Sequence, residues 1–139
     1  MHKILVDYAL PFAYEALEPY LSREINHFHF DKHTMGYIKR YNDEIQKHAD
    51  VDTLPFIEAL QILVREIRGG DNTRLKLFQD GAQAWNHYAF WSGIGLSRPM
   101  NSEGVEMKKA SLSPVFGSIE SFKDDFVNAG KSRFGSGWV

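Results

Sequence analysis

Three histidines lie close together in the first quarter of the chain, at His27, His29 and His33. His29 and His33 are four residues apart, so an unbroken helix places both imidazoles on one face. Two imidazoles on one face can bind a divalent metal ion. The alternative is a partly exposed polar face, because histidine pairs also arise on helices by chance. The spacing leaves both interpretations open.

Another histidine, His87, lies in residues 84–91, the most apolar part of the helix predicted over residues 74–96. A buried imidazole must satisfy both ring nitrogens or bear the cost of losing water. It can do so as a core histidine that is hydrogen-bonded to a backbone carbonyl. It can also do so as a metal ligand that packing holds on a rigid helix. Composition does not choose between these two roles.

Two polar residues extend the faces on which these histidines lie. Gln83 comes four residues before His87, and its amide could hydrogen-bond solvent on a metal. Tyr37 comes four residues after His33 and could continue a polar line along that face. Gln83 could equally be an ordinary surface glutamine. Tyr37 could equally be a core residue with a satisfied hydroxyl.

The elements that must position these residues are helices. Hydrophobic periodicity and capping signals predict helices over residues 20–30, 32–47, 55–68, 74–96 and 119–129. Asp31 is the expected cap of the second helix, and Gly130 the expected end of the last. The helix over 74–96 is apolar on nearly all sides after Ala82, which predicts a buried central helix.

The pattern as a whole predicts a mainly α protein. Residues 1–97 form the expected helical-hairpin domain, with an antiparallel helix pair at its heart. Residues 98–139 form an expected linker followed by the beginning of an incomplete α/β domain. Polar residues with prolines and glycine make 97–114 an expected loop. Residues 134–139 read as a turn entering a strand whose partner strands the chain does not supply.

Composition excludes several classes of function. The 139 residues include 16 basic and 18 acidic side chains, with no basic stripe of the kind nucleic acid would need. No apolar run approaches the ~20 residues of a membrane span. Cysteine is absent, so any metal site must use histidine, carboxylate or water. We expect a cytoplasmic protein that binds neither nucleic acid nor membrane.

Four blocks of sequence resemble iron/manganese superoxide dismutases. The segment 10–19 resembles the family's opening, and His29 to Tyr37 resembles its His-x-x-x-His-x-x-x-Tyr segment. The segment 81–91 resembles the helix of the second ligand, and 134–138 the entrance to the C-terminal sheet. The blocks occur in the family's order and are spread from residue 10 to residue 138, so the resemblance extends over nearly all of the chain.

This resemblance implies a redox metal site for the disproportionation of superoxide to dioxygen and hydrogen peroxide. It implies iron as the cofactor, with manganese as the alternative, because Gln83 falls where iron-type members carry an outer-sphere glutamine. Superoxide is an anion and the chain is slightly acidic, so local cations such as Lys32 must attract it. The implied site residues are His29 and His87 as metal ligands, His33, Tyr37 and Gln83 as catalytic residues, and Trp85 and Trp138 as surrounding walls.

The resemblance is incomplete in one respect. The family's other two ligands, in an Asp-x-Trp-Glu-His type segment, have no counterpart in this sequence. We therefore expect the chain alone to bind metal loosely or not at all. One hypothesis is a superoxide dismutase of which this chain is an N-terminal portion or half of a split protein, with a homo-oligomer or a complementing chain as the expected partner. Another is a two-histidine site that a second subunit completes. The alternative is a truncated, non-catalytic homologue that serves as an interaction or structural module.

Overall fold

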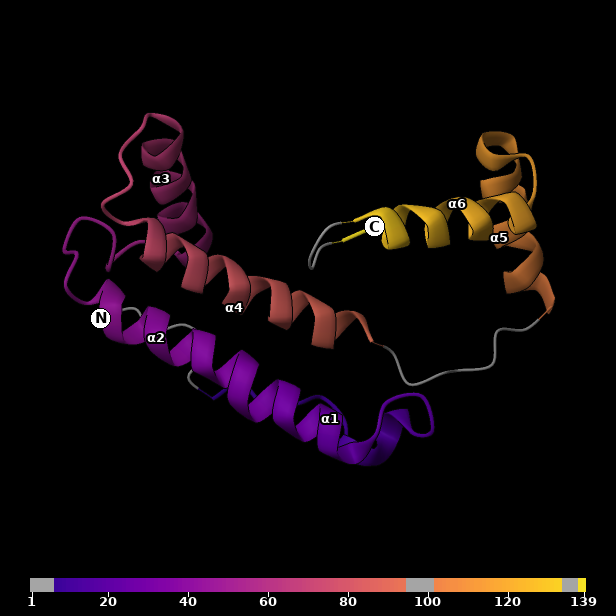
Figure 1. Cartoon of the computed structure of the whole chain (residues 1–139), viewed down its shortest axis with the longest axis horizontal. Helices are drawn as coiled ribbons and strands as arrows, with labels where there is room; N and C mark the ends of the chain where they lie inside the picture. Colours follow the sequence, from indigo (N-terminus) through magenta and orange to yellow (C-terminus); the bar gives the residue numbers. More distant parts are fainter. Residues whose placement is uncertain (1–6, 95–101, 134–137) are drawn as a thin grey trace. The chain divides into compact units, whose positions relative to one another are not determined.

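The fold is mainly α-helical, as the sequence predicts. The computed structural model describes residues 7–94, 102–133 and 138–139, and this part of the chain contains no strand. The chain divides into two compact units, Met1–Leu96 and Ser97–Val139, each of which is described by itself. Figure 1 shows the helices of both units.

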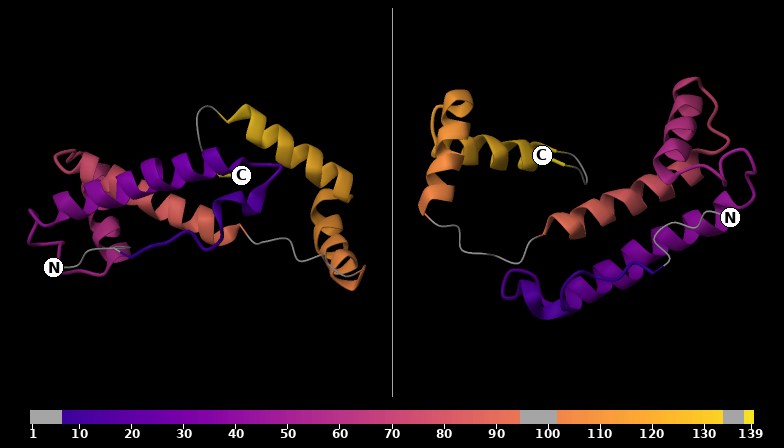
Figure 2. Two further views of the ribbon diagram at one scale, coloured as in Figure 1. Left: turned by 90° about the horizontal axis from the view of Figure 1, so that it is seen from below. Right: turned by 180° about the vertical axis from the view of Figure 1, so that it is seen from behind.

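The first unit is built on a helical hairpin, as expected. One continuous helix comprises α1 (Arg23–Phe28), a π-helical turn (His29–Thr34) and α2 (Met35–Ile45). It lies alongside α4 (Leu75–Gly93), which runs in the opposite direction (Figures 1 and 2). The chain reverses between them through α3 (Phe56–Arg68).

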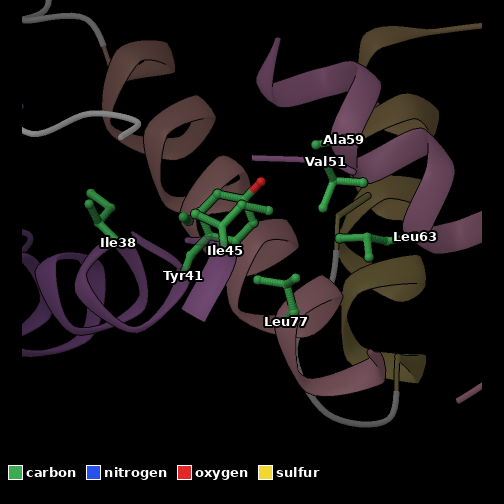
Figure 3. Close-up of a cluster of buried hydrophobic side chains, with 8 residues drawn as sticks. Ile38, Tyr41, Ile45, Val51, Ala59, Leu63 and Leu77 are labelled. Atoms are coloured by element: carbon green, nitrogen blue, oxygen red, sulfur yellow. The ribbon is translucent and has the colours of Figure 1, made fainter. Parts of the chain in front are cut away.

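The hydrophobic core lies where α2, α3 and α4 meet. Its buried side chains come from all three helices and from the connection after α2 (Figure 3). The members are Ile38, Tyr41, Ile45, Val51, Ala59, Leu63, Leu77 and Ala84. Each fully buried aliphatic or aromatic side chain contributes roughly 1.5–3 kcal/mol, so this cluster is what fixes α2 against α4.

Gly81 marks the closest approach of α4 to its neighbours. A Cβ atom at this position would lie 2.7 Å from Leu60 of α3 and 2.7 Å from the ring of Tyr41 of α2. Only hydrogen fits in that space. The glycine therefore allows the three helices to pack closely in the middle of the unit.

Arg74 braces the beginning of α4. Its guanidinium forms hydrogen-bonded ion pairs with Asp50, after α2, and with Glu66 of α3. The side chain is 14% exposed. Both carboxylates raise the pKa of Arg74, the Glu66 hydrogen bond most strongly. One cation thus joins three segments of the chain.

The second unit is a pair of helices, α5 (Ser102–Phe116) and α6 (Ile119–Ser132). The hydroxyl of Ser118 accepts a hydrogen bond from the Ser121 amide at 3.0 Å and so caps the start of α6. A run of aromatic contacts joins Phe116, Phe122 and Phe126. No described side chain of this unit is fully buried.

Several predicted boundaries were wrong. Residues 102–114, expected within a loop, belong to α5, which includes Pro114 in its last turn and ends at Phe116, before Gly117, a glycine with φ +80°. Helix α6 continues past Gly130 to Ser132. The expected strand falls largely on residues 134–137, which lie outside the described residues. Trp138 and Val139 are exposed and belong to no strand.

Candidate metal centre

The first structural feature of the candidate site is the π-helical turn that begins at His29. Asp31, expected to cap a new helix, lies inside this turn, and Ser22 caps the helix instead. The helix is therefore unbroken from Arg23 to Ile45, with a wider turn in its middle. Such turns interrupt α-helices rarely and are frequent at functional sites.

A buried hydrogen-bond chain anchors the π turn to α4. The indole N–H of Trp91 donates to the hydroxyl of Thr34 at 2.9 Å. That hydroxyl donates to the backbone carbonyl of His29 at 3.1 Å. Trp91 and Thr34 are both 0% exposed. The position of His29 along the hairpin is thus tied to a rigid residue of the opposite helix.

The structure brings His29 and His87 together across the hairpin. Their ring centroids are 5.0 Å apart, with the ring planes at 76°. A ring nitrogen binds a metal at about 2.1 Å, which places the ion roughly 3 Å from the ring centroid. Centroids 5.0 Å apart therefore fit two imidazoles on one ion. The separation of the two rings is therefore compatible with a shared metal ion.

A backbone contact fixes the tautomer of His87. Its Nδ1 lies 2.7 Å from the carbonyl oxygen of Gln83, one helical turn earlier. A carbonyl oxygen only accepts, so Nδ1 carries the proton, and in the neutral ring Nε2 keeps its lone pair. His87 is thus hydrogen-bonded to a backbone carbonyl through Nδ1, as expected of a core histidine. This leaves Nε2 available as a metal ligand, in the arrangement that metal-binding histidines commonly have.

Both imidazoles are held in the neutral form. Burial lowers the pKa of His29, and the neighbouring His87 and His33 lower it further. Burial also lowers the pKa of His87, partly opposed by the Gln83 carbonyl, while His33 adds to the lowering. Below an ordinary value of 6.5 these groups are uncharged at neutral pH. Neutral imidazole is the form that binds a metal.

His33 and Tyr37 lie beside this pair. The His33 ring centroid is 6.1 Å from that of His29, and the side chain is exposed. The Tyr37 ring centroid is 5.2 Å from that of His87. The described residues contain no group of three or more histidine, cysteine, aspartate or glutamate side chains that could hold a metal. At most two such side chains therefore meet at any one place in this part of the chain.

His27, the remaining histidine of the cluster, is engaged elsewhere. Its Nε2 lies 3.0 Å from Asp31, whose other carboxylate oxygen accepts a hydrogen bond from the Tyr14 hydroxyl at 2.9 Å. This contact ties the segment before α1 to the π turn.

Trp85 and Trp138, expected as walls of the site, are both exposed to solvent. The prediction that the central helix is buried all round was wrong: Trp85 is 42% exposed and packs beside Phe56 and Tyr88. Trp85 lies two positions before His87, about 200° around the helix, so the two side chains lie on different sides of α4. Trp138 belongs to the second unit and is 62% exposed.

Sequence reasoning missed Thr34, Trp91 and Phe90 as neighbours of His29. Trp91 and Phe90 lie 4.9 and 5.4 Å from the His29 ring, centroid to centroid. The signal for Trp91 was its position four residues after His87. No sequence signal pointed to Thr34, because its role depends on the π turn.

Comparison with known proteins decides the family. The sequence profile for iron/manganese superoxide dismutases, alpha-hairpin domain, matches residues 7–95, which is more than half of the chain. The chain belongs to the iron/manganese superoxide dismutase family. The resemblance seen in the four sequence blocks is thereby confirmed, and the hairpin that brings His29 to His87 is this family's α-hairpin.

Three cyanobacterial relatives carry the name superoxide dismutase [Fe]. The protein of Synechococcus elongatus is 38% identical over 131 residues, and those of Synechocystis and Leptolyngbya boryana are each 32% identical over 130 and 131. The matches cover 94% of this chain and 61, 61 and 62% of the relatives. The chain thus spans about three-fifths of their length. No helix among the described residues is long and apolar enough to cross a membrane.

Proposed function

We propose that the hairpin supplies two ligands of a mononuclear iron site for superoxide disproportionation, with His29 and His87 as those ligands. The observation that carries the proposal is the pairing of these two imidazoles at 5.0 Å, between centroids, from opposite helices. The names of the three relatives favour iron over manganese. Bound iron would supply the one-electron chemistry that turns superoxide into dioxygen and hydrogen peroxide.

The residues of the chain prepare this site in three ways. The Gln83 carbonyl holds the His87 proton on Nδ1 and so directs Nε2 toward the metal. The Thr34–Trp91 chain fixes the backbone at His29. Burial keeps both rings neutral, so no proton has to leave before a cation binds at neutral pH.

The residues around the pair would serve the substrate. Tyr37, beside His87, and His33, at the exposed side of His29, would line the approach to the metal. The amide of Gln83 would tune the metal from one turn before His87. The roles of Trp85 and Trp138 as walls of the site stay predictions, as does a cytoplasmic location.

A second candidate function is a non-catalytic interaction or structural module of the same family. The described residues hold only two suitable donors, which favours this alternative for the hairpin on its own. A trivalent metal in such a site also calls for a carboxylate. We propose that a homo-oligomer or a complementing chain supplies the remaining ligands where the enzyme is active.

Metal content separates the two functions. The purified chain is expressed with iron and manganese available, and both metals are measured per chain by elemental analysis. About one iron per chain, lost in His29→Gln and in His87→Gln but kept in His48→Gln, supports the iron site, and a superoxide assay follows. Negligible metal in the wild-type chain overturns an iron site held by this chain alone, and the enzyme function would then belong only to a longer or complemented protein.

A further inference from the structure

Arg40 is a charged residue of α2 that sequence reasoning did not associate with the site. It comes three residues after Tyr37, and its guanidinium carbon lies 4.6 Å from the centroid of the Tyr37 ring. A guanidinium at this distance is attracted to the face of an aromatic ring. The Tyr37 ring thus has an imidazole neighbour, His87, and a cationic neighbour, Arg40.

Asp80 of α4 holds this guanidinium in place. Its Oδ1 accepts a hydrogen bond from Nε of Arg40 at 3.0 Å, and its other oxygen pairs with Lys76. The Asp80 side chain is 6% exposed, whereas that of Arg40 is 49% exposed. A buried carboxylate requires charged or hydrogen-bonding partners. The anchor is therefore rigid, although the arginine itself reaches solvent.

The anchor and the candidate ligand share one face of α4. Asp80 and His87 are seven residues apart, which is two helical turns. On α2, Tyr37 and Arg40 are three residues apart and also share a face. Because the helices are antiparallel, the Tyr37–His87 contact and the Arg40–Asp80 contact lie one after the other along the same interface between α2 and α4. The tyrosine ring is thus held by His87 from α4 and by Arg40, which α4 itself holds through Asp80.

We propose that Arg40, fixed by Asp80, is the positioning residue that holds the Tyr37 ring against His87. The functional meaning of this arrangement rests on the proposed role of Tyr37 beside the iron site. The local geometry does not depend on metal. Removing the guanidinium frees one face of the tyrosine ring, so the ring samples other rotamers and its contact with His87 is lost.

The test is an NMR measurement on the metal-free full chain with ¹³C-labelled tyrosine and histidine. Tyr37→Phe and His87→Gln assign the two rings. We expect a nuclear Overhauser contact between the rings in the wild type and its loss in Arg40→Met. The matched control is Lys76→Met, which removes a cation from the same carboxylate without touching Tyr37. The contact should persist in that variant.

A second variant distinguishes loss of the ring contact from a general folding defect. Asp80→Leu removes the anchor without leaving a buried charge, and it should weaken the ring contact while circular dichroism stays helical. An unchanged contact in Arg40→Met, or an equal loss in Lys76→Met, overturns the proposal. Because no metal is present, failure of iron uptake would overturn the proposed function and leave this result standing.

Discussion

The indole N–H of Trp91 donates to the hydroxyl of Thr34 across the hairpin, at 2.9 Å and with both residues fully buried. The two residues are 57 positions apart in the sequence. Because the same hydroxyl bonds the His29 carbonyl, this contact sets where the π turn lies against α4. The geometry of the candidate site therefore depends on a threonine that contributes no ligand.

The first prediction concerns this threonine. Thr34→Val keeps the shape of the side chain but leaves the Trp91 N–H buried without its acceptor. We expect a loss of about 1–3 kcal/mol in the free energy of unfolding, the cost of an unsatisfied buried donor. Urea unfolding measures it. Thr53→Val, at an exposed position, is the control and should change stability little. Equal stability of both variants would show that the Trp91 bond is unimportant.

The second prediction concerns pH. The pKa values of His29 and His87 are lowered in the folded state, chiefly by burial. At mildly acidic pH the unfolded chain binds more protons than the folded chain, so stability rises with pH through this window. It should fall as pH drops below about 6.5, the unfolded value. Thermal unfolding between about pH 8 and pH 3 should show this slope between about pH 6.5 and 5, reduced in His29→Gln and in His87→Gln.

The same titration contains its own control. The pKa values of Asp50 and Glu44 are lowered by hydrogen bonds to Arg74 and Lys47 respectively. Their contribution to stability is present above their unfolded values and is lost at more acidic pH, below about 4.5. That part of the profile should survive both histidine substitutions. A slope between pH 6.5 and 5 that also survives would contradict the assignment to His29 and His87.

The third prediction concerns the close packing at Gly81. In Gly81→Ala the new methyl group would lie 2.7 Å from Leu60 and from Tyr41, whose side chain is 1% exposed. Overpacking of this kind lowers the free energy of unfolding by about 1–3 kcal/mol. The better helix propensity of alanine raises it by roughly 1 kcal/mol at most. We expect net destabilisation. Gly93→Ala is the matched control, because nothing lies within 4 Å of its added carbon. That variant should be as stable as the wild type or slightly more.

The fourth prediction concerns Arg74. Its planar guanidinium meets two carboxylates at once, which the point charge of lysine cannot reproduce. Arg74→Lys should therefore lower the free energy of unfolding by roughly 1–3 kcal/mol. Arg65→Lys, on the exposed side of α3, is the control. The difference between the two variants, measured by urea unfolding, should persist at high salt because Arg74 is mostly buried.

Apolar spacing predicted the helices, whereas the pairing of His29 with His87 was expected only from the family resemblance. Apolar spacing located α3 and α4 within a few residues, since burial of one face dominates helix formation. The prediction that Asp31 caps a new helix was wrong, because sequence alone does not distinguish an aspartate that caps a helix from one inside a π turn. Asp31 is instead paired with His27 and Tyr14, which spacing could not reveal.

Contacts between distant residues were beyond sequence reasoning. The bond of Thr34 to Trp91 and that of Arg40 to Asp80 join positions 57 and 40 residues apart. Only the packing of α2 on α4 brings them together. Trp85 shows the converse error, since an apolar residue in an apolar run was taken as buried and is 42% exposed. Hydrophobicity indicates that a residue can be buried, but the fold determines whether it is.

The π turn also sets the rotational phase of the helix that carries His29. Each residue advances an α-helix by about 100°, so one residue more or less in this turn rotates everything before it by that angle. Deleting one residue there would swing His29 away from His87 while leaving the contacts of α2 with α4 in register. The placement of His29 and the packing of α2 on α4 are therefore separately adjustable, and a single insertion or deletion in the turn is enough to change the first without the second.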